Sequence, residues 1–357
     1  MQELVIKIIL APFSLLYGSL VGLRNAAYRL GFLKSVQFDV PTISVGNLST
    51  GGTGKTPHTE YLVRLLKDYI NVGTLSRGYG RKTEGFLIVQ AHLTAQQAGD
   101  EPLQLKRKNP DVMVAVGESR AFAIPRMLMQ QPDLQTIILD DAFQHRAITP
   151  ALNILLSDQN HLFTDDYLLP SGRLREWRAA YRRADIVIVT KCPANFSVGE
   201  KEKISAKIKP YLHQKLYFSY FDYGTPYYLF APQHTFSLGE KVEILLLSGI
   251  AKTDYLKKYL QKQAKTVHTL EYADHHFFEQ QEMEDLKTNF ERLKNEAKEK
   301  TVVIVTTEKD ATRLGAHRDF LLQHRLPIFV LPIQVAFHFG EGAIFDQQIK
   351  DFLVQFR

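Results

Sequence analysis

Residues 41–57 read PTISVGNLSTGGTGKTP, in which an apolar run leads into a glycine-rich loop and a Lys-Thr pair. The apolar run predicts a strand, and Pro57 suits the first turn of a helix, where no N–H partner is lost. Glycines let consecutive backbone N–H groups converge on phosphate oxygens, and the helix N-terminus adds a partial positive charge. The stretch therefore predicts a phosphate-binding loop (P-loop) between a strand and a helix.

The loop mechanism assigns roles to particular residues. Lys55 is expected to reach the β- and γ-phosphates, and the Thr56 hydroxyl is expected to ligate Mg²⁺. Position 49 departs from the strict pattern, which has glycine there, and a glycine-rich loop without a ligand is the alternative. The residues expected to contact the nucleotide are Ser49, Thr50, Gly51, Gly52, Thr53, Gly54, Lys55 and Thr56.

Two further positions bear on the type of nucleotide. Guanine-binding proteins carry Asn/Thr-Lys-x-Asp after a late strand, whereas residues 190–193 read TKCP, with Pro193 in place of the aspartate. Thr50 also differs from the lysine of the deviant P-loops in dimeric partitioning-type ATPases. The sequence therefore favours ATP.

The composition is that of a folded protein with a basic surface. The chain has 357 residues, which predicts two domains, and 45% of them are hydrophobic. Its single cysteine, Cys192, excludes an internal disulfide and a cysteine-based metal site, and suits a reducing compartment. The net charge of +6 allows nucleic acid, anionic lipid or a phosphorylated substrate as a partner. No aromatic-plus-basic module supports nucleic acid, and no obligate protein partner is predicted.

The first 35 residues contain an uncharged run, residues 8–23. It is shorter than the roughly 20 residues that a spanning helix needs, and it contains Pro12. On a helix, small or polar residues would line one face and apolar residues the broad opposite side. Basic residues flank the run, so we expect an interfacial helix on an anionic membrane. The small or polar face comprises Ser14, Gly18, Gly22, Asn25 and Arg29, and the apolar side Phe13, Leu16, Tyr17, Leu20 and Leu23.

Three alternatives fit the same N-terminal pattern. The helix could be a core helix docked by its small face onto the next domain, or a tilted spanning helix. It could also be a signal peptide, although Glu3 does not fit the basic start of such a segment.

After Pro41, apolar runs alternate with amphipathic stretches, which is typical of an α/β protein with a mainly parallel sheet. The expected fold class is a P-loop NTPase core plus a second, smaller α/β domain and an N-terminal membrane-interacting helix. The expected division is 1–35 for this helix, 36–215 for the core, 216–230 for a linker ribbon, and 231–357 for the second domain with a C-terminal helix. The final segment, 344–356, could alternatively return to the first domain. Expected strands are 42–45, 71–75, 112–116, 136–139, 152–156, 186–190, 244–247, 267–270, 302–305 and 328–331. Expected helices are 56–69, 118–130, 199–209, 254–263, 280–298 and 344–356.

Two carboxylates end a buried strand in residues 136–141, TIILDD. A Walker-B acid that holds Mg²⁺ needs this placement beside the P-loop, so Asp140 is the candidate. The alternative is that the Asp-Asp pair only caps a turn.

Other polar clusters each have a structural alternative. Residues 99–102 (GDEP) could be an N-cap, and residues 274–276 (DHH) a surface turn, since a zinc site would need a third ligand. Two basic loops, 76–81 (SRGYGR) and 171–177 (SGRLREW), suit an anionic sugar or phosphate but could be solvated surface. Residues 306–310 (TTEKD) could be adenine-side or structural.

Taken together and in this order, these motifs resemble the tetraacyldisaccharide 4'-kinase family, the lipid A kinases of Gram-negative envelopes. The resemblance implies two α/β domains across a cleft and transfer of phosphate from Mg-ATP to the 4'-hydroxyl of a tetraacyl disaccharide 1-phosphate. It also implies a peripheral enzyme at the cytoplasmic face of the bacterial inner membrane. The matching residues are 45–47, 51–57, 76–81, 99–102, 140–145, 174–176, 274–276 and 307–310.

The resemblance also implies roles for individual residues. The implied catalytic residues are Asp100, paired with His275 or alternatively His276, together with Lys55 and Asp141. The implied metal ligands are Thr56, Asp140 and Glu101, and the implied substrate and phosphate contacts are Arg77, Gln144, His145, Arg175 and Glu176. Ala142 departs from the family's glycine, and Arg173 and Trp177 stand where the family often has prolines.

Two other functional classes remain open from the sequence. A membrane-associated P-loop ATPase could couple hydrolysis to conformational work, and a nucleotide-gated membrane-binding module would catalyse nothing.

Overall fold

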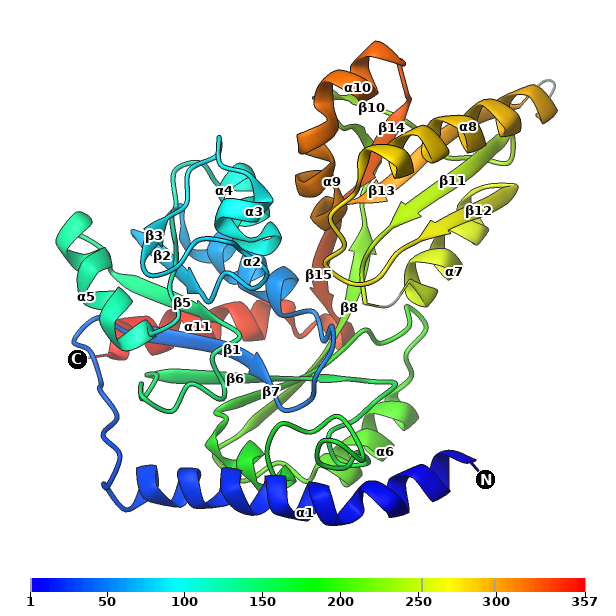
Figure 1. Ribbon diagram of the computed structural model, residues 1–357. Coiled ribbons are helices and arrows are strands. Elements are labelled where there is room, and N and C mark those ends of the chain that lie inside the picture. The colour runs from blue at the N-terminus through cyan, green and yellow to red at the C-terminus, as the bar shows by residue number, and fades with distance from the viewer. Residues whose placement is uncertain (1, 252, 298–299, 357) are drawn as a thin grey trace.

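The computed structural model describes residues 2–251, 253–297 and 300–356. The expected domain limits at Met1 and Arg357, and the expected helix end at Lys298, lie outside these residues. Two sheets carry the fold (Figure 1), a nine-stranded sheet and a six-stranded sheet. The α/β class and the mainly parallel P-loop core predicted from the sequence are therefore confirmed.

The central strands of the larger sheet are parallel and buried along their whole length. Such strands are apolar on both faces because helices cover both sides of a parallel sheet. β1 lies between β5 and β6, which places the loop after β1 near the middle of the sheet. The strand order is β15 (Ile333–Phe337), β8 (Lys215–Tyr223), β7 (Ile186–Thr190), β6 (Leu152–Asp158), β1 (Thr42–Asn47), β5 (Thr136–Asp140), β2 (Val72–Ser76), β4 (Met113–Val116) and β3 (Leu87–Ile88).

Three helices of this part, α2, α5 and α6, lie close to predicted ranges, whereas α3 and α4 are not among the expected helices. Helix α4 begins directly after Gly99, whose φ of 90° breaks the preceding short helix α3. The helices here are α2 (Lys55–Leu66), α3 (Ala95–Ala98), α4 (Asp100–Lys108), α5 (Arg120–Gln130) and α6 (Val198–Ile208), with a 3-10 helix at Arg178–Arg183.

The smaller sheet has a parallel centre and antiparallel pairing at one edge. Its strand order is β10 (Ala231–Thr235), β9 (Tyr227–Tyr228), β14 (Ile328–Leu331), β13 (Thr301–Thr307), β11 (Val242–Ser248) and β12 (Thr266–Glu271). Its helices are α7 (Asp254–Gln263), α8 (Gln280–Glu296), α9 (Glu308–Leu314) and α10 (Arg318–Gln323), with a 3-10 helix at Gly315–His317.

The end of the chain returns to the larger sheet, and this corrects the expected division of the chain. β8, expected within the linker 216–230, is a full strand of the nine-stranded sheet, and β15 pairs with it antiparallel. Helix α11 (Gly342–Gln355) follows a 3-10 turn at His338–Gly340 and buries Phe345 and Ile349 in the core that contains Ile43 of β1. Residues 333–355 therefore pack with the P-loop core and not with the six-stranded sheet; the other expected domain limits stay predictions.

Helix α1 (Gln2–Arg29) lies lengthwise against the underside of the larger sheet's domain (Figure 1). Its small face contacts the loop between β6 and β7: the Ser14 hydroxyl donates to Leu168 O at 3.1 Å, and Trp177 Nε1 donates to Gly18 O at 2.8 Å. A Cβ at Gly18 would lie 2.5 Å from Leu168 Cδ1, so this approach requires glycine. The predicted small face is therefore the face that docks.

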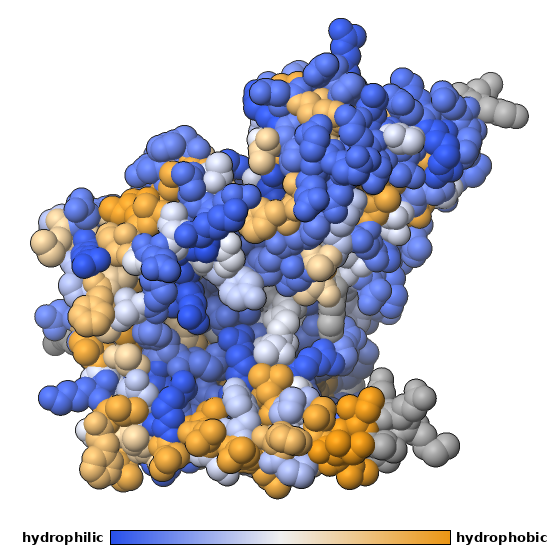
Figure 2. Space-filling view, viewed as in Figure 1, coloured by the Kyte–Doolittle hydropathy of each residue, from blue (hydrophilic) through white to orange (hydrophobic). Residues whose placement is uncertain are grey.

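Most of the apolar side of α1 faces away from the protein (Figure 2), but Tyr17, expected on that side, donates from its hydroxyl to Arg175 O at 2.9 Å. Only 11% of the most apolar window is buried, so α1 docks by its small face without being a buried core helix. Within the described residues, α1 is the one helix long and apolar enough to cross a membrane, by length and composition. Its exposed apolar side chains are Ile6, Ile8, Ile9, Phe13, Leu15, Leu16, Leu20 and Leu23.

Candidate active site

The glycine-rich loop joins β1 to α2, as the sequence predicts. Gly51 and Gly54 have φ values of 101° and 88°, which residues with a side chain rarely adopt. A Cβ at Gly54 would also lie 2.9 Å from the ring of Phe221. Helix α2 begins at Lys55, so its first N–H groups, which have no partner inside the helix, belong to the loop. This geometry suits phosphate oxygens.

Asp140 is the last residue of β5 and lies beside the start of α2. The Thr56 hydroxyl donates to Asp140 Oδ2 at 3.5 Å, while Asp140 Oδ1 is buried without a partner. Burial, together with the charge of Glu101, raises the pKa of Asp140 to about 7. An unpaired buried carboxylate oxygen next to a hydroxyl and a P-loop fits a divalent cation, because Mg²⁺ is usually held by one or two carboxylates plus substrate phosphates.

Asp141 follows in the left-handed region, with a φ of 47°. Its carboxylate lies 3.7 Å from Lys55 Nζ and 3.2 Å from Arg175 Nη2. Burial alone would raise the pKa of Asp141, but the charges of Lys55 and Arg175 outweigh it and lower the pKa. The positive φ falls on the aspartate and not on Ala142, so the turn needs no glycine at position 142.

Asp100 begins α4, in the part of the chain with the larger sheet, and His275 follows β12 of the smaller sheet. Their side chains meet where the two parts touch. His275 Nδ1 lies 3.1 Å from Asp100 Oδ2, and His275 is held in a turn with a φ of 60°. His276 instead stacks on Tyr272 and pairs with Glu282 at 2.8 Å. The structure therefore brings His275, and not His276, to Asp100.

Lys309 of α9 extends this cluster. Its Nζ lies 3.2 Å from Glu101 Oε1, 3.2 Å from Asp274 Oδ1 and 3.8 Å from Asp100 Oδ2. Burial would lower the pKa of Lys309, but the charges of Glu101 and Asp100 outweigh it and raise the pKa. The same kind of balance lowers the pKa of Asp100, since the His275 hydrogen bond and the Lys309 charge exceed the cost of burial.

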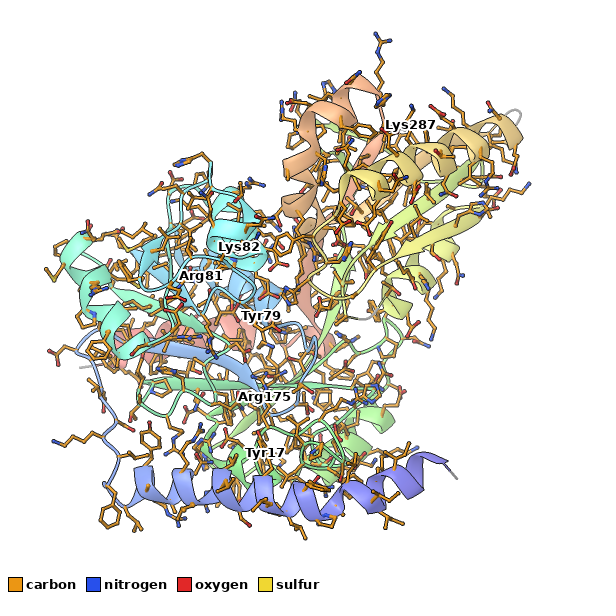
Figure 3. All side chains as sticks on the ribbon, in the orientation of Figure 1. Tyr17, Tyr79, Arg81, Lys82, Arg175 and Lys287 are labelled. Atoms are coloured by element: carbon orange, nitrogen blue, oxygen red, sulfur yellow. The ribbon has the colours of Figure 1, made fainter. Side chains whose placement is uncertain are left out.

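Sequence reasoning missed Lys309, Arg313 and Tyr79 as members of this site. Arg313 Nη1 lies 3.8 Å from Asp100 Oδ2, and the Tyr79 ring lies 4.8 Å from the His275 ring. Figure 3 shows Tyr79 between the two sheets. Lys309 and Tyr79 belong to the quoted stretches 306–310 and 76–81, but only the fold shows which way these stretches face.

The turn after Asp141 contacts the end of β1 and the start of α5. Gln144 Nε2 donates to Asn47 O at 2.8 Å, and His145 Nε2 accepts from the backbone N–H of Arg120 at 3.3 Å. Burial and the charges of Arg120 and Arg77 lower the pKa of His145 to about 4. His145 is thus neutral near pH 7, and Arg77 is an exposed cation near it.

Arg175 and Glu176 are neighbours in sequence, but their side chains contact different parts of the protein. Arg175 contacts Asp141 and Asn47, and Figure 3 shows it between α1 and the P-loop. Glu176 is fully buried; its carboxylate accepts from Arg183 at 3.0 Å and from Asn25 of α1 at 2.6 Å. The expectation that Glu176 lines the substrate side is therefore not met, because its carboxylate is enclosed and fastens α1 to the loop.

The arrangement combines a phosphate cradle, a candidate metal pair and a carboxylate–imidazole pair. Of the residues predicted from the sequence, the structure groups Lys55, Thr56, Asp140 and Asp141 around the loop, and Asp100, Glu101 and His275 next to α9. The site thus offers cations and N–H groups that can neutralise charge on a transferred phosphoryl group, and a carboxylate that can accept a proton. Phosphoryl transfer to a hydroxyl uses both.

Comparisons with known proteins agree with this geometry. The family described as tetraacyldisaccharide-1-P 4'-kinase matches residues 6–353. The chain is 43% identical to the tetraacyldisaccharide 4'-kinase of Bacteroides fragilis, with 98% of this chain and 94% of the relative covered. It is 41% identical to the enzyme of that name from Flavobacterium johnsoniae, with 92% of each covered.

A solved structure agrees as well. The crystal structure of LpxK from Aquifex aeolicus in complex with ATP superposes with a TM-score of 0.71 at 28% identity, covering 97% of this chain and 99% of that one. The similarity in sequence and in fold extends over nearly the whole chain, and the geometry of the site agrees with it. The chain therefore belongs to the tetraacyldisaccharide 4'-kinase family and is a P-loop kinase.

Proposed function

We propose that this kinase transfers the γ-phosphate of Mg-ATP to the 4'-hydroxyl of a tetraacyl disaccharide 1-phosphate, a lipid A precursor. The observation that carries the proposal is the Asp100–His275 pair at 3.1 Å, placed next to a P-loop and a Walker-B carboxylate. A carboxylate positioned to accept the proton of an attacking hydroxyl suits phosphoryl transfer to a sugar.

Proton transfer is assigned to Asp100. Lys309 has only donors to offer, so His275 Nε2, at 3.2 Å from Lys309 Nζ, accepts. His275 Nδ1 then carries the hydrogen and donates to Asp100 Oδ2, which keeps this carboxylate ionised and oriented. Asp100 accepts the proton of the attacking hydroxyl, and His275 is the residue that orients it.

Charge on the transferred phosphoryl group is met by Lys55 and the loop N–H groups. Thr56 and Asp140 would hold the metal, with Glu101 as a further ligand once it leaves Lys309. When bound, the metal would neutralise charge on the β- and γ-phosphates. Arg175, Arg77, Gln144 and His145 are proposed to line the phosphate and sugar side.

The acceptor's acyl chains place the reaction at a membrane surface, which we propose to be the cytoplasmic face of the bacterial inner membrane. Helix α1 contacts the protein at Ser14, Gly18 and Asn25, so it lies along the domain and does not project from it. A helix fastened by polar contacts over this length favours interfacial binding over spanning. The flanking basic residues would face anionic lipid headgroups.

The test is a reaction of the full chain with Mg-ATP and the purified tetraacyl disaccharide 1-phosphate in mixed micelles. Mass spectrometry should show a product heavier by one phosphoryl group, with ADP formed in equal amount. Lys55→Ala should abolish both, and Lys287→Ala on α8, far from the site in Figure 3, should change neither. ATP hydrolysis that proceeds equally fast without acceptor would contradict the proposal.

A further inference from the structure

Three consecutive carbonyl groups of the phosphate-binding loop are each held by a side chain from outside the loop. Gly51 O accepts from Asn47 Nδ2 at 3.4 Å, Gly52 O accepts from Lys191 Nζ, and Thr53 O accepts from the Thr190 hydroxyl at 2.8 Å. Two of these donors are adjacent residues at the end of β7, a strand that does not itself adjoin β1.

Peptide geometry gives these contacts a consequence. In a planar trans peptide the C=O of one residue and the N–H of the next point in opposite directions. The peptides after Gly51, Gly52 and Thr53 are trans, so fixing each carbonyl turns the following N–H away from its donor. The N–H groups fixed in this way are those of Gly52, Thr53 and Gly54, within the loop that would face phosphate.

The surroundings of Lys191 show that it is built for this contact and not for binding phosphate. Its Nζ lies 3.3 Å from Asp158 Oδ2 at the end of β6, so a carboxylate offsets its charge. The side chain is 13% exposed, and its backbone φ is 60°, a conformation that residues with a Cβ adopt at a cost. An outlier of this kind persists only where surrounding contacts hold it.

We infer that Thr190 and Lys191 are positioning residues that hold the phosphate-binding loop from behind in the conformation that receives a nucleoside triphosphate. The inference rests on the proposed ATP-dependent function. It goes beyond that function in assigning part of the nucleotide affinity to residues that touch no phosphate. It also gives a physical role to the first two residues of the TKCP stretch, Thr190 and Lys191.

The test compares Lys191→Met, which keeps the methylene stem and removes the donor, with Lys191→Arg, which keeps a donor. ATP affinity measured by calorimetry, and the KM for ATP, should weaken about 10- to 100-fold in the methionine variant, as expected for a lost hydrogen bond from a charged group. The arginine variant should recover part of this, and kcat at saturating ATP should change little. Lys287→Met on α8 is the matched control.

Folding is controlled with a second variant. Lys191→Met leaves Asp158 unpaired, so Lys191→Met/Asp158→Asn removes that charge as well, and Thr190→Val tests the neighbouring contact with nearly the same shape. Both should weaken ATP binding while the thermal unfolding midpoint stays near that of the parent. Unchanged ATP affinity in both, with the parent binding ATP, would overturn the inference. Absence of ATP binding in the parent itself would instead overturn the proposed function.

Discussion

Asp100 is a buried carboxylate, 3% exposed, that nevertheless stays ionised. Burial favours its neutral form, but the His275 hydrogen bond and the cations Lys309 and Arg313 outweigh burial and lower the pKa of Asp100. A carboxylate kept in its basic form, with a hydrogen bond fixing its orientation, is ready to accept a proton from a sugar hydroxyl.

Asp100→Asn tests the role of Asp100 as proton acceptor. The amide keeps the shape but cannot accept the proton, so kcat should fall about 10²- to 10⁴-fold. ATP affinity should stay close to that of the parent, because the P-loop is untouched. Asp285→Asn on α8 is the control. Turnover near the parent's would remove Asp100 from the mechanism.

His58 on α2 predicts how stability depends on pH. The side chain is buried between Gly54 O, at 2.7 Å from Nδ1, and the Ser219 hydroxyl, at 3.0 Å from Nε2. Burial lowers its pKa from 6.5 to about 4. Between these values the unfolded chain binds the proton and the folded chain does not, so stability falls as pH falls through this window.

The measurement is urea unfolding of the parent and of His58→Gln at several pH values from about 4 to 6.5. As pH falls, the parent's free energy of unfolding should decrease faster than that of His58→Gln, by up to about 1.4 kcal/mol per pH unit. His145, whose pKa is also lowered to about 4, contributes equally to both proteins and cancels in the difference. Equal slopes would show that His58 is not the group that titrates.

At this scale, the sequence predicted residues that act within one local motif. Lys55, Thr56 and Asp140 follow from a loop, a helix start and a strand end, each readable over a few residues. Lys309 and Arg313 act on Asp100 from α9, more than 200 positions along the chain. No spacing rule could predict that these residues contact Asp100 without the fold. The burial of Glu176 could not be predicted for the same reason.

Among the elements, α1 leaves a row of large apolar side chains uncovered by protein. Leu16 and Leu20 are 62% and 61% exposed, although burial of each would be worth about 1.5–3 kcal/mol. A lipid surface is the environment in which that apolar area leaves water.

Leu16→Glu/Leu20→Glu should therefore lower binding to anionic vesicles by at least about tenfold in a flotation assay. Leu212→Glu, at an exposed leucine outside α1, is the control. Extraction of membrane-bound parent protein by alkaline carbonate should release it if α1 is interfacial. Resistance to extraction would favour a spanning helix, and unchanged flotation of the double variant would contradict membrane binding by this face.

Element prediction succeeded where the pattern is local and regular. The buried strands β7 and β14 and the helix α7 have the predicted limits, because apolar runs and amphipathic periodicity mark them. The aromatic stretch at 216–230 is extended and contains Gly224 and Pro226, a pattern that also predicts a linker ribbon. The pairing of β8, which ends at Tyr223, with β15 over 100 positions later makes the first part of this stretch a sheet strand.

For the whole molecule, α4 and α9 form one of the contacts between the parts of the chain that hold the two sheets. Lys108 of α4 pairs with Glu60 of α2 and, at 2.7 Å, with Glu308 of α9. Removing the lysine would leave two carboxylates facing each other in a mostly buried place.

Lys108→Met should therefore lower the thermal unfolding midpoint by on the order of 5 °C. Adding Glu308→Gln should recover part of the loss, because one of the two opposed charges is then gone. Lys203→Met on the exposed surface of α6 is the control. A midpoint equal to the parent's would show that this bridge does not join the domains.

The return of β15 and α11 to the larger sheet has a consequence for how the protein is made. Phe345 and Ile349 fill the same core as Ile43, so the part that is translated first remains incomplete until translation is nearly over. The six-stranded sheet, by contrast, has all its strands once Leu331 has left the ribosome. The six-stranded sheet can therefore be completed during synthesis before the nine-stranded one, which lacks β15 and α11 until synthesis is nearly complete.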